Sequence, residues 1–177
     1  MSRRKGYRLR REREREDDAV FREVARKKQA LTKEECVSIL KNTRRGVLSV
    51  LGDDGYPYGL PINHWYNEED GRLYFHSGKT GHKIDALQRC GKASFTVMDE
   101  SKRKDGEWWL SFRSVIVFGR VEFVKDPEKA LSVSRSLSLL FTGDTDYIEK
   151  EIRAYGPAVL CFALTPEHMT GKRVVEK

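Results

Sequence analysis

Short apolar runs separated by turn residues dominate the sequence after residue 46, and this pattern restricts the fold more than any other feature. Val47 to Leu51 is followed by Asp53-Asp54-Gly55, and Tyr56 to Tyr66 by Glu68-Glu69-Asp70-Gly71. Asp-Gly pairs favour the tight turns of β-hairpins. Strands joined by such short turns pair antiparallel, because a parallel pair needs a long crossover connection. The pattern therefore disfavours a parallel, doubly wound sheet.

Strands are expected at six places and helices at five. The strands cover residues 47–51, 56–66, 72–76, 93–98, 108–124 and 158–164, and the helices 17–29, 32–42, 82–90, 126–140 and 144–154. Thr32 followed by Glu35 forms a capping box at the start of the second helix. Gly119 lies inside the fifth strand, where it predicts a bulge or a close backbone approach. This order predicts an α+β fold built on an antiparallel β-barrel.

The second expected strand contains two prolines, Pro57 and Pro61. Because proline has no backbone N–H, this strand is not expected to pair regularly along its whole length. Neighbouring backbone groups are then free to face a planar heteroaromatic ring, which singles out the stretch around Leu60 to Asn63. The alternative is an ordinary edge strand.

The N-terminal stretch differs from the rest of the chain in its charge. The formal net charge is +7, and most of this excess lies in residues 1–16, which are rich in arginine and end in an alternating Arg-Glu tract. We therefore expect a charged extension with a short helix, residues 1–30, and a folded domain, residues 31–177. A basic segment favours nucleic acid as a partner. This segment has few aromatic side chains and partly neutralises its own charge, so no nucleic-acid partner is expected.

Cysteine spacing and apolar run lengths indicate the compartment. Cys36, Cys90 and Cys161 are too far apart for a disulfide framework or a zinc site, and such isolated thiols are typical of a reducing cytoplasm. The apolar runs are far short of the roughly 20 residues that a transmembrane helix needs. No apolar stretch follows the basic N-terminus, as it would in a secretory signal. A cytoplasmic protein without membrane partners or metal is expected.

The most informative stretch is the expected strand end, loop and helix start at residues 73–85. His76 and Ser77 lead into a loop with Gly78 and Gly81, and His82 and Lys83 occupy the first turn of the following helix. The first turn of a helix has unpaired N–H groups and a partial positive charge, which favour an anion such as phosphate. The spacing matches neither a Walker A loop nor a dinucleotide fingerprint. A plain polar connection with solvated lysines is the alternative.

Together, these stretches resemble the pyridoxamine 5′-phosphate oxidase-like flavoproteins, known as FMN-binding split barrels, and within them the 5-nitroimidazole resistance branch. The resemblance extends over about residues 31–173. It is carried by residues 54–63 (DGYPYGLPIN), 71–77 (GRLYFHS), 81–87 (GHKIDAL) and 114–121 (SVIVFGRV), and by the tail at 170–173 (TGKR).

The resemblance implies a six-stranded antiparallel split β-barrel with flanking helices that binds FMN between the subunits of a homodimer. Leu60, Pro61, Ile62 and Asn63 would lie along the isoalloxazine ring. His76 and Ser77 would contact the ribityl phosphate, which His82 and Lys83 would neutralise. Ser114 and Val115 would reach the flavin ring of the partner subunit.

The resemblance also bears on the reaction. Vitamin B6 oxidation is disfavoured, because Gly81-His82-Lys83 stands where the B6 oxidases have Arg-x-Lys. The expected activity is FMN-dependent reduction of a small aromatic or nitro compound, with NAD(P)H a plausible donor and His76 the candidate catalytic residue. His64 is a weaker candidate. The alternative is a flavin- or haem-binding protein of the same fold without reductase activity.

Overall fold

Seven strands form one antiparallel sheet in the computed structural model, which describes residues 21–103, 105–106 and 108–175. The strand order is β2-β1-β5-β6-β7-β4-β3. The strands are β1 (Arg45–Leu51), β2 (Pro57–Asn63), β3 (Trp65–Asn67), β4 (Arg72–Gly78), β5 (Lys92–Met98), β6 (Ser111–Phe123) and β7 (Val159–Val175). The helices are η1 (Lys27–Gln29), α2 (Lys33–Asn42), η2 (Asp53–Gly55), α3 (His82–Arg89), α4 (Pro127–Leu139), α5 (Thr145–Tyr155) and η3 (Gly156–Ala158).

The two edge strands of this sheet, β2 and β3, are consecutive pieces of chain separated by His64 alone. β2 pairs with β1, and β3 pairs with β4, so the segment 57–67 joins the two edges of the curled sheet. The prediction of an antiparallel α+β barrel is confirmed. Six strands were expected and seven are found, because the expected strand 56–66 divides at His64.

The prolines do not interrupt β2. Its pairing with β1 runs without a break from Pro57, opposite Leu51, to Asn63, opposite Arg45. The expected strand 56–66 therefore does not pair regularly along its whole length, but the interruption lies at His64 and not at a proline, as the prediction had it. The prolines are tolerated because β2 is an edge strand on this side of the sheet.

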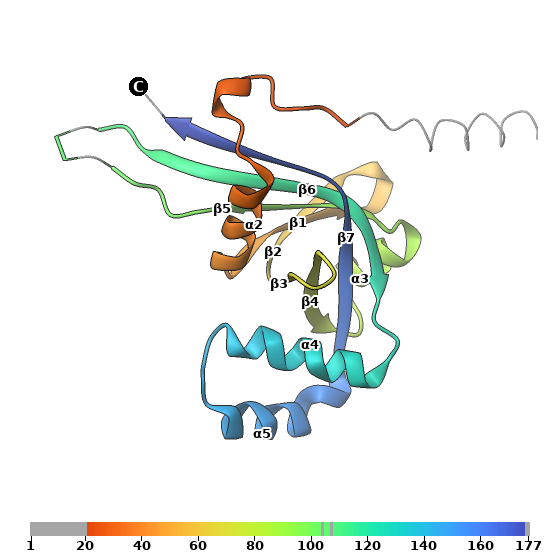
Figure 1. Cartoon of the computed structure of the whole chain (residues 1–177). Helices are drawn as coiled ribbons and strands as arrows, with labels where there is room; N and C mark the ends of the chain where they lie inside the picture. The colour runs from red at the N-terminus through yellow and green to blue at the C-terminus, as the bar shows by residue number, and fades with distance from the viewer. Residues whose placement is uncertain (1–20, 104, 107, 176–177) are drawn as a thin grey trace, which may run out of the picture.

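The main core fills the inside of the barrel. Phe75, Phe95 and Phe162 meet there, with ring centroids 5.1 Å and 5.2 Å apart in the two pairs that involve Phe75. A second cluster lies on the other face of β4 and β7, under α4. Figure 1 shows α4 and α5 stacked on the side of the barrel opposite α2. Both faces of β4 are thus covered, which is why Leu73, Tyr74 and Phe75 are all buried.

Gly119 marks the one shift in the register between β6 and β7, next to Phe118. A Cβ atom at Gly119 would lie 2.1 Å from the carbonyl oxygen of Thr165. The predicted bulge and close backbone approach are confirmed. The capping box at the start of α2 is also present, with both the Thr32 and the Glu35 side chains bonded.

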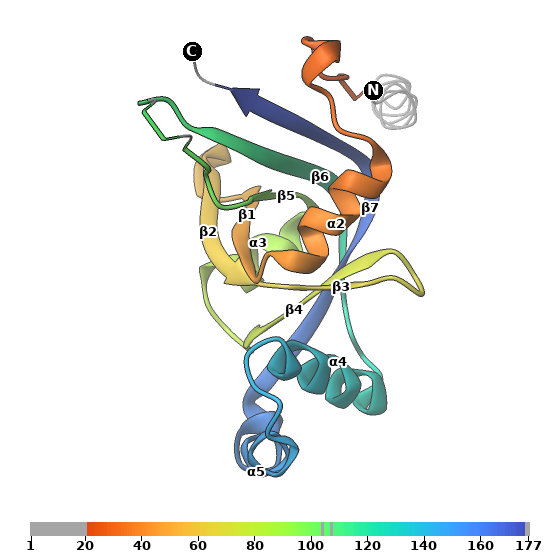
Figure 2. The ribbon, with the colours of Figure 1, turned by 60° about the vertical axis from the view of Figure 1, so that its left-hand side comes forward.

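The expected helix 17–29 is not found in its described part. Residues 21–26 are extended or irregular, and only η1 is helical. Phe21 instead stacks on His168, with ring centroids 4.9 Å apart, and contacts Phe118 at 5.6 Å. These tertiary contacts outweigh the helical spacing of the apolar residues. Residues 17–20 lie outside the described residues. Figure 2 shows residues 21–26 beside the outer side of β6 and β7.

Candidate functional site

The loop between β4 and α3 ends in a helix start without a side-chain cap. Gly81 is the N-cap, with φ +115°, a value that L side chains rarely adopt. Its carbonyl accepts bonds from the N–H groups of Ile84 and Asp85. The N–H groups of His82 and Lys83 have no partner within the helix, since they belong to its first turn. These two amides are donors for an anion.

Lys83 is the free cation at this position. Its side chain is half-buried, and it makes no ion pair with any described residue. A cation beside the first turn of a helix adds to the attraction for a phosphate. Of the predicted phosphate ligands, Lys83 is therefore the one whose charge is available.

His82 lies in the first turn as predicted, but its ring contacts the β1–β2 hairpin. The imidazole stacks on Tyr58, with centroids 4.1 Å apart, and its Nε2 lies 3.5 Å from a carboxylate oxygen of Asp53. Arg89, at the other end of α3, donates to the same carboxylate at 2.6 Å. Asp53 therefore ties both ends of α3 to the hairpin, so His82 orients the helix. Asp53 and Tyr58 were not singled out in the sequence, because only the register of β1 and β2 brings them to α3.

His76 and Ser77 lie at the end of β4, next to this loop. Tyr74, which shares a strand face with His76, packs under α4, and His76 is half-buried opposite Cys161. Desolvation by burial lowers the pKa of His76 below its ordinary value. The imidazole is therefore neutral at pH 7. The Ser77 hydroxyl donates to the carbonyl of Gly78 at 2.6 Å.

The outer edge of β2 presents backbone groups away from β1. The N–H of His64 donates to the carbonyl of Arg44. By the alternation of an antiparallel pair, the backbone N–H and C=O groups of the even-numbered residues of β2 point toward β1, and those of the odd-numbered residues point away from it. Pro57 and Pro61 have no N–H to leave unpaired. The outward N–H groups are those of Gly59 and Asn63. This edge is a row of carbonyl acceptors with two donors, as a polar heteroaromatic edge requires.

Residues 60–63 are the ring strand, which is predicted to lie along the isoalloxazine ring. Their side chains divide between the two faces of the sheet. Leu60 and Ile62 point into the barrel core, where Ile62 is buried, and Pro61 is exposed on the outer face. The side-chain oxygen of Asn63 accepts a bond of 2.9 Å from Nε of Arg45. Arg45, the first residue of β1, is a cation beside the end of β2 that the sequence did not single out. Its pairing with Asn63 in the β1–β2 register is what reveals it.

Ser114 and Val115, on β6, lie three strands away from β2 in the sheet. Val115 is fully buried in the core, whereas Ser114 is half-buried on the outer face. With neighbouring strands about 4.8 Å apart, Ser114 is about 14 Å from β2 across the sheet. One chain therefore does not bring Ser114 to the ring strand, and Val115 offers only its backbone to a ligand.

His64, the weaker catalytic candidate, is a core residue. Its side chain is 0% exposed, Nε2 lies 2.9 Å from the carbonyl oxygen of Leu40, and the ring meets Phe95 edge-on. Desolvation by burial lowers its pKa to about 4. His64 thus joins α2 to the break between β2 and β3, and no reactant can reach it.

Two further findings concern metals and membranes. No group of three or more potential metal-ligating side chains occurs among the described residues. In the same part of the chain, no helix is long and apolar enough to cross a membrane.

The sequence model of the pyridoxamine 5′-phosphate oxidase family matches residues 32–173. The chain belongs to this family. The match covers α2 to α5, β1 to β6 and β7 as far as residue 173, and it leaves out residues 1–31 and 174–177 of this family member. No curated protein matches the chain.

Solved structures share the split-barrel fold of this family member. One is described as a 5-nitroimidazole antibiotic resistance protein from Bacteroides thetaiotaomicron. It has 26% identity and a TM-score of 0.65, over 81% of this chain and 86% of that one. A FAD-binding protein from Mesorhizobium loti has 24% identity and a TM-score of 0.62, over 82% and 97%. A FAD and haem binding protein from Mycobacterium smegmatis has 22% identity and a TM-score of 0.67, over 85% and 74%.

Proposed function

We propose that this chain is an FMN-binding flavoprotein that reduces small aromatic or nitro compounds. The observation that carries the proposal is the uncapped start of α3 with the unpaired Lys83 beside it. It offers two amides and a cation to one phosphate. Two neighbouring structures are named FAD-binding proteins, which agrees with a flavin, and one is named a 5-nitroimidazole resistance protein, which agrees with a nitro compound as substrate.

Several of the predicted residues then have distinct roles. Lys83 and the amides of the first turn hold the phosphate, and the contacts of His82 with Tyr58 and Asp53 hold α3 in place. The outward N–H groups of β2 donate to the polar edge of the ring. Bound flavin supplies the two-electron transfer that no side chain of this site can perform. His76, neutral at pH 7, is a proton donor or acceptor next to the phosphate loop.

A second copy of the chain completes the site in this proposal. Two rows of side chains cross the outer face of five strands without a charged residue. They are Pro61, Val47, Thr96, Ile116 and Thr170, and Gly59, Ser49, Ser94, Phe118 and His168. Val47, Ile116 and Phe118 in these rows are exposed, and exposed apolar side chains without charged neighbours in their row are typical of a homodimer interface. Docking of a copy there would bring its Ser114 to the ring strand, which the Ser114 of the same chain does not reach.

The proposed reaction uses NAD(P)H as the reductant. In its first step, a nitroaromatic, NAD(P)H and a proton give a nitrosoaromatic, NAD(P)⁺ and water. The test is to purify the full chain, identify any released cofactor by mass, and follow NADPH oxidation with a nitroimidazole. FMN in the preparation and nitroimidazole-dependent oxidation are expected. A colourless protein that takes up no FMN would refute the proposal.

The alternative is a haem-binding protein of the same fold, and one neighbouring structure is named a FAD and haem binding protein. A haem would need an accessible axial ligand. His64 is buried in the core, His82 stacks on Tyr58, and His168 stacks under Phe21. His76, half-buried at the end of β4, is therefore the candidate axial ligand. A Soret band in the spectrum of the purified protein would favour this alternative over a flavin-only protein.

A further inference from the structure

A hollow of about 440 Å³ lies between the N-terminal segment and the outer face of the sheet. Its wall is formed by the segment residues Val24 and Arg26. Its floor is formed by Ser114 and Ile116 of β6 and by Thr170 and Lys172 of β7. The volume suits a small aromatic molecule. The floor combines one apolar side chain with two hydroxyl groups, so it accepts a flat ring with a polar substituent.

The charge of the hollow is unbalanced. Arg26 and Lys172 line it, and no Asp or Glu does. Neither cation makes an ion pair with a described residue. Two other hollows differ, because both contain Arg113 together with Asp99, and Nε of Arg113 lies 2.7 Å from that carboxylate. Two cations without counter-charges raise the local positive potential, which an anion relieves.

We infer that this hollow binds the carboxylate of an aromatic substrate. The inference rests on the proposed function, in which Ser114 faces the flavin of the partner subunit. A substrate in the hollow would then lie beside that flavin. Arg26 and Lys172 bind the anion, the hydroxyls of Ser114 and Thr170 donate to it, and Ile116 and Val24 contact the ring. Within the small aromatic compounds of the proposed function, those that carry a carboxylate should bind more tightly than neutral ones.

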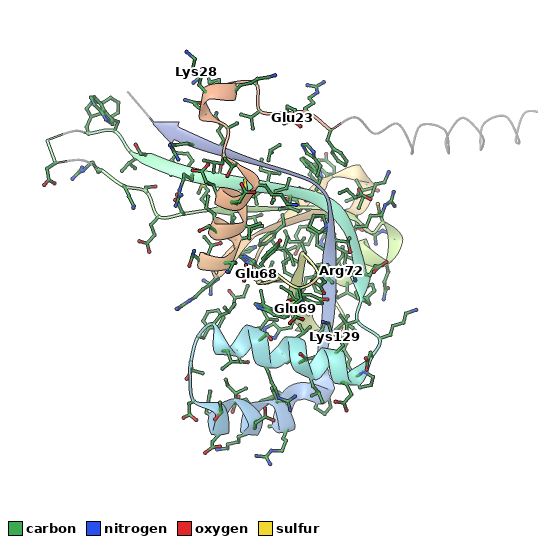
Figure 3. The ribbon with its side chains drawn as sticks, in the orientation of Figure 1. Glu23, Lys28, Glu68, Glu69, Arg72 and Lys129 are labelled. Carbon is green, nitrogen blue, oxygen red and sulfur yellow. The ribbon has the colours of Figure 1, made fainter. Side chains whose placement is uncertain are left out.

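The test is a calorimetric titration of the full, flavin-loaded protein with benzoate. Arg26→Gln and Lys172→Gln should each weaken benzoate binding about tenfold, since each removes one charge-assisted contact. Benzamide, which has the same shape without the charge, should bind equally to all variants. Lys28→Gln is the matched control, because Lys28 lies at the outer end of the same segment and points away from β6 and β7 (Figure 3). It should bind benzoate like the unaltered chain.

Two results would overturn the inference. One is an equal loss of benzoate binding in Lys28→Gln. The other is no binding of benzoate; if inorganic pyrophosphate binds instead, Arg26 and Lys172 would be assigned to the phosphates of NAD(P)H. The flavin content, read from visible absorbance, tests the proposed function separately. A flavin-loaded protein that does not bind benzoate would refute this inference alone, whereas a protein that takes up no FMN would refute the proposed function.

Discussion

Two histidines show how the same side chain takes different roles according to its surroundings. His64 is enclosed by the core and bonded to a backbone carbonyl, and its pKa is lowered to about 4. His76 is half-buried at a strand end, beside the loop that leads to α3. Both are neutral at pH 7, but only His76 is open to a ligand. The two candidate histidines differ in their exposure to solvent, which cannot be read from a sequence.

Burial of His64 makes the stability of the fold depend on pH. The unfolded chain has a histidine pKa of about 6.5, so it binds more protons than the folded chain between pH 6.5 and 4. Stability should fall by about 3 kcal/mol as the pH drops through that window. Urea unfolding of the unaltered chain and of His64→Gln, which has an N–H donor but does not titrate there, checks this. Parallel pH curves for the two proteins would contradict it.

Lys83 is the side chain on which the phosphate site depends most. Lys83→Ala should weaken FMN binding about tenfold, because one charge-assisted contact is lost. Lys125→Ala removes an exposed cation from the loop between β6 and α4 and should leave the affinity unchanged. Quenching of FMN fluorescence measures both. Equal FMN affinities for Lys83→Ala and the unaltered chain would show that the phosphate of FMN does not bind beside Lys83.

At the scale of elements, the barrel depends on where long strands bend or break. β6 and β7 bend at Gly119, whose missing side chain leaves room for the carbonyl of Thr165. The segment 57–67 breaks at His64 and pairs with β1 on one side and β4 on the other. These two places hold β2, β4 and α3 in the arrangement that forms the candidate site.

Gly119→Ala tests the close approach of β6 and β7. A methyl group 2.1 Å from a backbone oxygen cannot be accommodated without a shift of the strands. We expect a loss of about 2 kcal/mol or more in the free energy of unfolding. Gly143→Ala, in the loop between α4 and α5, meets nothing within 4 Å and should change stability by less than about 1 kcal/mol. Similar unfolding midpoints for the two variants would show that the approach is not constrained.

For the whole molecule, local patterns predicted the fold well. Asp-Gly turns, the capping box at Thr32 and the alternation of the strands depend on neighbouring residues, and each appears in the structure. The contacts of His82 with Asp53 and Tyr58 depend on strand register, which a single sequence does not reveal. The segment 21–26 was wrongly expected to be helical, because its apolar residues meet β6 and β7.

Dimerisation through the two uncharged rows of the outer face is testable at Val47, which is 44% exposed there. Val47→Arg should give a monomer with weakened FMN binding, since two buried arginines without partners oppose docking. Leu139→Arg alters an exposed apolar residue on α4, 53% exposed, and should leave the mass and the affinity unchanged. Light scattering coupled to gel filtration gives the mass. A dimer of Val47→Arg with normal FMN affinity would place the interface elsewhere.

In the proposed complex, FMN binds between two subunits, with its phosphate at the start of α3. A titration of the full, unaltered, cofactor-free chain with FMN tests this most directly. We expect saturation at one FMN per chain, by a protein that is dimeric when loaded. The absence of any change in FMN fluorescence at saturating protein concentrations would contradict it.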